Sequence, residues 1–217
     1  MPEPLPLQFY ARSAVDLAPD LLGKRLVREL DGALLAGRIV EVEAYLGGED
    51  AASHAFRGPT PRNRSMFGPP GRAYVYLIYG VHYCLNIVTG PEGDGQAVLI
   101  RALEPLAGVE VMRANRGRVT ERDLTNGPGK LCQALGIDKR LDGHDLCLGV
   151  GLWLEDGPPP DGPICASPRV GVRGDDAALT RPWRYFIEDN PFVSRSPLNR
   201  ACRPVISVLS DGISTSA

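Results

Sequence analysis

The sequence predicts a single α+β domain in which helices flank a curved, mainly antiparallel β-sheet. Two patterns favour this fold class: strand-like apolar segments follow one another through short turns, and helical segments do not alternate with them regularly. The chain of 217 residues is 43% hydrophobic and 23% charged, which suits one substantial core. We therefore expect one domain over residues 1–217, with a core over about 13–195 and loosely ordered termini.

The first half of the chain predicts a short helix and then a series of strands. Residues 13–24 have a helical pattern that Ser13 caps, Pro19 interrupts and Gly23 ends. Turns at Asp31-Gly32 and Tyr79-Gly80 indicate two hairpins. Strand patterns lie at 25–30, 34–45, 73–78, 83–88 and 97–103.

The second half is less regular. A helix is expected over 104–116, with Pro105 in its first turn, where proline is tolerated. A second helix is expected over 130–135, after Gly127-Pro128-Gly129. A surface turn at 157–163, strands at 169–172 and 183–187, and a poorly ordered tail after Pro197 complete the prediction.

Bulk charge and hydropathy exclude several classes of protein. A net charge of −2 disfavours a broadly basic nucleic-acid binder. No apolar run approaches the roughly 20 residues that a membrane-spanning helix needs. The N-terminal residues lack the basic and apolar regions of a signal peptide, so we expect a cytoplasmic protein.

The cysteines indicate neither a disulfide framework nor a metal site. They are odd in number, scattered and without a C-x-x-C pair, and the three histidines have no metal-ligand spacing. We therefore expect reduced, mostly buried thiols, no metal and no cofactor. The five positions are Cys84, Cys132, Cys147, Cys165 and Cys202.

An apolar strand pattern over 38–45 carries two glutamates and a tyrosine on one face. Because side chains alternate along a strand, Glu41, Glu43 and Tyr45 point to the same side. A buried carboxylate is costly unless it is paired or functional, so the pattern indicates a pocket with a catalytic acid or base. The alternative is an exposed edge strand whose glutamates contact solvent.

Two further polar residues lie inside apolar strand patterns. Arg101 must find an acceptor within 97–103, and Asn86 needs hydrogen-bond partners within 83–88. Together with Glu43 they predict a polar pocket on one sheet, although a structural glutamate–arginine pair explains two of the three equally well.

A segment rich in glycine, proline and arginine follows the carboxylate strand. Residues 51–72 contain Arg57, Arg62, Arg64 and Arg72 and no acidic residue. Such a loop can bind phosphate, or it can be an ordinary solvated loop. Tyr79 at a turn is either an anchor for a partner or a surface residue.

The motifs RIVEVEAYLGGEDAASHAF, TPRNRSMFGPPGRAYVYLIYGVHYCLNIV, GDGQAVLIRALEPLAGVEVMR and NGPGKLCQALGI resemble the alkyladenine (3-methyladenine) DNA glycosylase family. The resemblance covers residues 22–193 in the same order. It implies a monofunctional glycosylase that flips an alkylated or deaminated purine from damaged double-stranded DNA. A water activated by glutamate then hydrolyses the N-glycosidic bond and leaves an abasic site, in base excision repair by a monomer.

The same resemblance assigns roles to individual residues. Glu43 matches the general base, with Glu41 supporting it, and Arg101 and the Val170 carbonyl match groups that hold the water with it. Positions matching the base-binding pocket are Tyr45, His54, Tyr76 and Asn86. Positions matching DNA contacts are Thr60, Arg62, Arg64, Met66, Lys130 and Tyr79, the last as a wedge in the minor groove. A nucleosidase acting on free nucleosides and a non-catalytic nucleic-acid-binding module are the alternatives.

Overall fold

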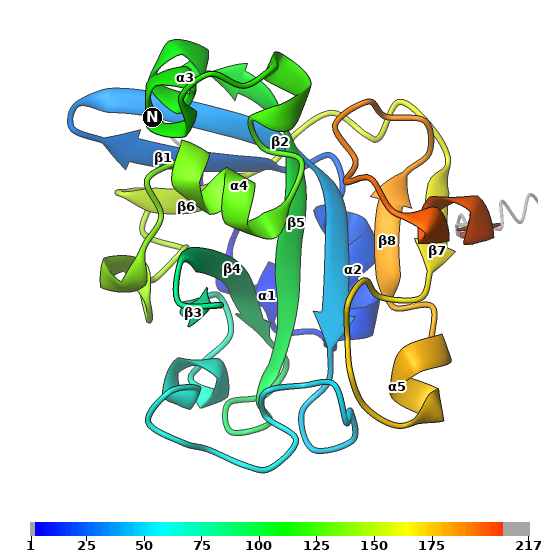
Figure 1. The fold of residues 1–217 in the computed structure, drawn as a ribbon. Coiled ribbons are helices and arrows are strands. Elements are labelled where there is room, and N and C mark those ends of the chain that lie inside the picture. Colours follow the sequence, from blue (N-terminus) through cyan, green and yellow to red (C-terminus); the bar gives the residue numbers. More distant parts are fainter. Residues whose placement is uncertain (1–2, 206–217) are drawn as a thin grey trace, which may run out of the picture.

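A computed structural model describes residues 3–205 and confirms the α+β fold with a mostly antiparallel, open sheet (Figure 1). The sheet has nine strands, in the order β3-β4-β5-β2-β8-β7-β9, with β1 and β6 extending from β2. The strands are β1 (Arg25–Leu30), β2 (Ala33–Tyr45), β3 (Ala73–Ile78), β4 (His82–Thr89), β5 (Gln96–Ala107), β6 (Leu152–Glu155), β7 (Ile164–Ser167), β8 (Arg184–Ile187) and β9 (Arg203–Pro204).

Five short α-helices pack around the sheet. Ser13 caps α2, as predicted, but the helix continues through Pro19 to its last residue. α2 packs against β2 and β5, and α4 packs against β4 and β5. The helices are α1 (Leu7–Tyr10), α2 (Ala14–Leu21), α3 (Val109–Arg116), α4 (Pro128–Ala134) and α5 (Asp176–Thr180). No helix in the described part of the chain is long and apolar enough to cross a bilayer.

The strand that carries the glutamates is not an edge strand at this point. β2 pairs with β5 along most of its length, and at residues 41–43 it also pairs with β8. Glu41 and Glu43 both have 0% exposed surface. Register shifts on either side of Glu41 mark a β-bulge, a feature that bends a strand locally. The edge-strand alternative is therefore wrong.

Two predicted elements differ in the structure. The helix expected from 104 begins only at Val109, because β5 continues to Ala107 and Gly108 then takes a positive φ of 69°. Pro105 sits beside a register shift opposite Gly37, where a strand tolerates a residue without an N–H. The strand expected at 169–172 is a loop without strand pairing.

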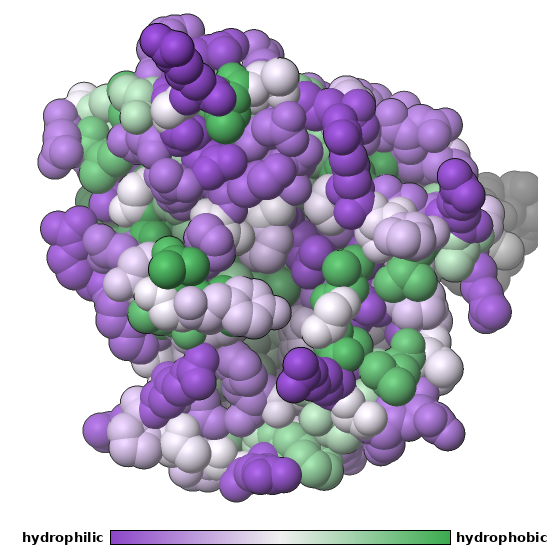
Figure 2. Space-filling view, viewed as in Figure 1, coloured by the Kyte–Doolittle hydropathy of each residue, from purple (hydrophilic) through white to green (hydrophobic). Residues whose placement is uncertain are grey.

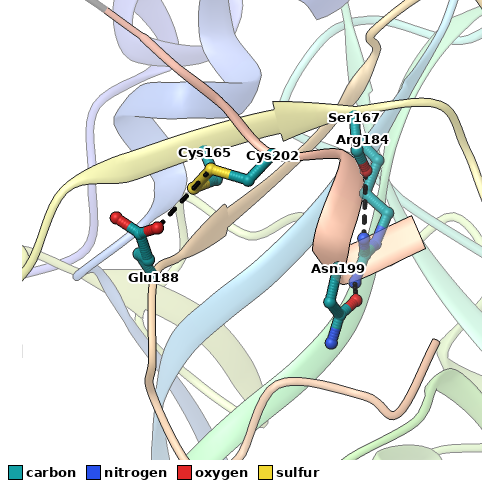
Figure 3. The surroundings of a disulfide bond; sticks show 6 residues. All are labelled: Cys165, Ser167, Arg184, Glu188, Asn199 and Cys202. Carbon is teal, nitrogen blue, oxygen red and sulfur yellow. Dashed lines mark hydrogen bonds between the residues drawn. A yellow bond between two sulfur atoms is a disulfide. The ribbon is translucent and has the colours of Figure 1, made fainter. Parts of the chain in front are cut away.

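The C-terminal part corrects two more predictions. Residues 197–205 contain a 3-10 helix, η4 (Pro197–Ala201), and β9, whereas the rest of the predicted tail lies outside the described residues. β9 pairs with β7, which brings Cys202 within disulfide distance of Cys165, with a Cα–Cα distance of 5.2 Å (Figure 3). The expectation that all thiols are reduced is thus wrong for this pair. The free cysteines are Cys84, Cys132 and Cys147.

Candidate active site

A cavity of about 460 Å³ lies where β2, β3, β4 and β5 meet the loop after β7. Its walls include all four residues predicted to bind the base and two of the three predicted catalytic residues. The outer surface in the view of Figure 2 is largely hydrophilic, and hydrophobic residues appear there in small separate groups. The predicted residues that line the cavity are Tyr45, His54, Met66, Tyr76, Tyr79, Asn86, Arg101 and Val170.

Glu43 lies directly behind this wall and is held by two hydrogen bonds and one ion pair. The Val170 N–H donates to Oε1 over 2.7 Å, and Nη1 of Arg101 lies 3.2 Å from the same oxygen. The Tyr45 hydroxyl donates to Oε2 over 2.8 Å. An ionised carboxylate offers about four acceptor positions. Oε2 accepts only from Tyr45, so one of its positions stays free, and Tyr45, Arg101 and Val170 all line the cavity.

Glu41 has a different environment. Its carboxylate accepts hydrogen bonds from the side chains of Arg101 (3.0 Å) and Arg184 (2.6 Å) and from both the amide and the hydroxyl of Ser194 (2.8 and 2.9 Å). Burial raises the pKa of Glu41, but the two arginines and the Ser194 amide outweigh it, so the pKa lies below its ordinary value. Glu41 is therefore an ionised structural anchor, and two of the residues that hold it, Arg184 and Ser194, do not line the cavity.

Arg101 joins the two carboxylates. Its side chain is 9% exposed, and the charges of Glu43 and Glu41 raise its pKa against the opposing effect of burial. The sequence left open whether Arg101 forms a structural pair with a glutamate or belongs to a polar pocket. The structural pair is present, with Glu41. The same guanidinium also contacts Glu43 at the cavity, so each interpretation describes part of one network.

Aromatic rings form much of the cavity wall. Burial and the charge of Glu43 raise the pKa of Tyr45 well above 10.0, so its hydroxyl stays protonated as a donor. The rings of His54 and Tyr76 meet edge to face, with centroids 4.5 Å apart. Nδ1 of His54 lies 2.9 Å from the hydroxyl of Tyr74, a cavity residue to which the sequence assigned no role.

The imidazole of His54 is neutral at pH 7. Burial of part of the ring and the charge of Arg62 lower its pKa below 6.5, although the residue as a whole is exposed. Asn86 is buried beside this cluster and donates from Nδ2 to the carbonyl of Tyr74 over 3.2 Å. The cavity therefore combines flat rings, neutral polar groups and the side chains of two arginines, Arg101 and Arg173.

The residues predicted to contact DNA occupy different environments. Tyr79 is 85% exposed at the tip of the β3–β4 hairpin, with φ of 53°. Thr60, Arg62 and Arg64 are exposed, and Arg62 donates to the Leu77 carbonyl over 2.9 Å.

Met66 and Lys130 are less accessible. Met66 is only 2% exposed and lines the cavity, so any contact with DNA would be made inside the cavity and not along the duplex. Nζ of Lys130 is bound to Asn126 (2.7 Å) and Asp123 (3.3 Å). This ammonium group is partly engaged within the protein.

Several residues that organise the site carried no clear signal in the sequence. Asn63 is buried and donates to the carbonyls of His54 (2.8 Å) and Gly58 (3.1 Å), which fixes the loop that presents His54. Asp50 and Arg169 form an ion pair that is buried behind Tyr45. Polar residues in loops are usually exposed, so only their contacts reveal these roles.

One cluster in the described residues has the composition of a metal site. Cys165, Cys202 and Glu188 place their ligand atoms within 4.8 Å of one another (Figure 3). The disulfide engages both sulfur atoms, so this state offers no thiolate pair. The cluster lies at β7 and β9, and none of its members lines the cavity.

Comparison with known proteins places the chain among DNA repair enzymes. The family model described as methylpurine-DNA glycosylase (MPG) matches residues 8–191. A protein of Carboxydothermus hydrogenoformans named "Putative 3-methyladenine DNA glycosylase" is 50% identical over 192 residues, covering 88% of this chain and 98% of that protein. Proteins of the same name from Methanocella arvoryzae and Chlorobaculum parvum are also 50% identical, over 88% of this chain and 96% and 90% of theirs.

Proposed function

The chain belongs to the methylpurine-DNA glycosylase family, and from this we propose that it flips a damaged purine out of duplex DNA and hydrolyses its N-glycosidic bond with a water activated by Glu43. The family and the relatives make it a DNA glycosylase, a hydrolase of N-glycosidic bonds in base excision repair. The observation that carries the proposal is the buried Glu43 carboxylate, which keeps one acceptor position free beside a cavity lined by rings.

The free position on Oε2 gives Glu43 its role as general base. Hydrolysis of a glycosidic bond needs a water on the face of the sugar opposite the leaving base and passes through an oxocarbenium-like state. An ionised carboxylate can accept the proton of that water and stabilise the positive sugar. Arg101 and the Val170 amide hold Oε1, whereas Oε2 has the Tyr45 hydroxyl as its one donor and is the oxygen we assign to the water.

The Val170 main chain contributes in a way that differs from the expectation. The resemblance implies a role for its carbonyl in holding the water, whereas the observed contact is the N–H to Glu43. We retain the Val170 carbonyl as part of the proposal, although it belongs to the peptide unit with Gly171 and not to the unit whose N–H contacts Glu43.

The ring-lined cavity suits an extruded purine. Tyr45 and Tyr76 offer faces for stacking, which is favourable for any base and more so for a cationic N3- or N7-alkylated purine. A damaged base that pairs poorly costs less to extrude, which contributes selectivity. None of the described residues lining the cavity is a lysine, so nothing there offers an amine nucleophile and the product would be an abasic site.

The exposed hairpin tip and the arginine-rich loop supply the proposed contacts with the duplex. Tyr79 would enter the minor groove and fill the gap left by the flipped nucleotide. Arg62 and Arg64 are exposed cations near the cavity and suit phosphate contacts. Action as a cytoplasmic monomer remains a prediction.

A panel of duplexes, each with one defined lesion, tests the function directly. We expect the wild-type protein to release free base from at least one of 3-methyladenine, 7-methylguanine, hypoxanthine and ethenoadenine, and to leave an abasic site. The matching free nucleosides are the control, because a nucleosidase would cleave them while a flipping enzyme needs the duplex. Release from nucleosides alone, or no release from any lesion, contradicts the proposal.

A further inference from the structure

Asp50 and Arg169 form an ion pair that is completely removed from solvent, with both side chains at 0% exposed. The contact is bidentate: Nη1 of Arg169 lies 2.6 Å from one carboxylate oxygen of Asp50, and Nη2 lies 2.8 Å from the other. The same two nitrogens donate to the carbonyls of Ala44 (3.0 Å) and Ala178 (3.2 Å). A buried fork of this kind fixes two chain segments 119 residues apart in one relative orientation.

The pair touches three parts of the cavity wall without lining the cavity itself. Its guanidinium carbon lies 4.5 Å from the centroid of the Tyr45 ring, and Tyr45 lines the cavity while Arg169 does not. Arg169 therefore supports that ring from outside the cavity. On the other side, the Asp50 carboxylate accepts from the amide of Ala52 (3.1 Å), at the start of the loop that leads to His54.

The third part of the wall is the segment that immediately follows Arg169. The next residue, Val170, donates its N–H to Oε1 of Glu43. Tyr45, under the guanidinium, donates its hydroxyl to Oε2 of the same carboxylate. Both hydrogen-bond donors on Glu43 are thus held by one buried arginine.

We propose that Asp50 and Arg169 are positioning residues for base excision: the pair fixes the Tyr45 hydroxyl and the Val170 amide on Glu43, so that the carboxylate keeps its free acceptor position toward the cavity. This inference rests on the proposed glycosylase function and on the role of Glu43 within it. Neither residue contacts the substrate or the reacting atoms. Their substitution should therefore slow the chemical step and leave the binding of the duplex unchanged.

Two conservative variants separate positioning from simple stability. Arg169→Lys keeps the positive charge but loses the fork and the planar contact with Tyr45. Asp50→Asn keeps the shape of the carboxylate and loses its charge. The measurement is the rate constant of base release in a single turnover with enzyme in excess, below the melting temperature. A merely structural loss changes the fraction of folded enzyme but not this rate constant.

We expect the rate constant to fall about 10- to 100-fold in either variant, because a misplaced hydrogen bond to a charged group weakens the transition state by that order. Affinity for a duplex with a tetrahydrofuran abasic-site analogue should stay within about twofold of wild type, since phosphate contacts dominate it. The matched control is Arg38→Lys, which alters an ion pair of β2 with Glu104 (3.0 Å) and Asp161 (3.3 Å), outside the cavity.

Each outcome decides a different question. A slow rate constant in Arg169→Lys with normal duplex affinity, beside a normal Arg38→Lys, supports the positioning role. Wild-type rate constants in folded Arg169→Lys overturn it, and this variant decides alone if Asp50→Asn does not fold. If the wild-type protein releases no base from any lesion duplex, the proposed glycosylase function is wrong. The lack of activity in the variants then does not result from their substitutions.

Discussion

Replacing Glu43 with glutamine should slow base excision by at least about 10²-fold while the fold persists. The geometry allows the substitution: the amide oxygen can take the place of Oε1 and accept from Val170 and Arg101. The amide NH₂ then faces Tyr45, whose hydroxyl can turn from donor to acceptor. The position that is free on Oε2 becomes an N–H group. It cannot accept a proton from water.

The expected size of the effect follows from the loss of one general base. Such a group contributes about 10²- to 10⁴-fold to a rate, or roughly 3–5 kcal/mol of transition-state stabilisation. The stability of the protein should change much less, because Arg101 keeps its contact with Glu41. Affinity for lesion-containing duplex should stay close to that of wild type, since no surface residue changes.

The same substitution at Glu41 should have the opposite effect: it should lower the stability of the protein more than the rate of excision. Glu41→Gln places an NH₂ group against the Ser194 amide that donates to Oε2, and it leaves Arg184, which is 0% exposed, without a carboxylate. Breaking a buried ion pair costs about 3 kcal/mol or more, which for a chain of this length lowers the melting temperature by about 6–12 °C. Below that temperature the excision rate of Glu41→Gln should exceed that of Glu43→Gln by at least about tenfold.

The assay is single-turnover release of free base, measured together with thermal unfolding for wild type and both variants. Expected is a slow but stable Glu43→Gln and a less stable but active Glu41→Gln. Excision at the wild-type rate by a folded Glu43→Gln protein would refute the assignment of Glu43 as general base. Equal loss of excision in both variants would show that the network acts as a unit.

Three further predictions address the hairpin, the disulfide and the response to acid. Tyr79→Ser should weaken binding to lesion-containing duplex in a gel-shift titration, because the wedge is lost; unchanged affinity would remove this role. Reduction of Cys165–Cys202, which are 37 residues apart, should lower the free energy of unfolding in urea by about 4 kcal/mol, whereas Cys202→Ser should not respond to reductant. The stability that Glu41 supplies is present above its unfolded pKa of 4.5 and is lost as pH falls through its lower folded value, so acid titration of wild type and Glu41→Gln should show their stabilities converging below pH 4.5.

The hairpins could be predicted from the sequence because the residues that determine a hairpin are close together in the chain. Alternation along β2 and β3, with glycine at each turn, determines strand type and face without any distant partner. The loop at 169–172 shows the opposite case. Its apolar and glycine residues have the pattern of a strand, yet the segment forms no strand pairing. The Arg169 side chain instead binds Asp50, which lies 119 residues earlier in the chain. Sequence patterns contain no record of that contact.

The disulfide was missed for a related reason. Cys165 and Cys202 become neighbours through a pairing of β7 with β9 that involves only two residues of β9. A strand this short has no periodicity to detect, and an odd number of scattered cysteines is typical of reduced thiols. Only the tertiary arrangement shows that the second cysteine lies beside the first.

The roles proposed for the two glutamates follow from the residues that surround each carboxylate. Both are buried, both lie on β2 and both contact Arg101, so the local sequence makes them equivalent. Arg184 and Ser194, which follow Glu41 by 143 and 153 residues, supply three of its four hydrogen bonds, and neither residue lines the cavity. Glu43 accepts its hydrogen bonds from Tyr45 and Val170, which both line the cavity. Base catalysis is therefore proposed for Glu43, because the C-terminal third of the chain binds Glu41 to groups outside the cavity wall.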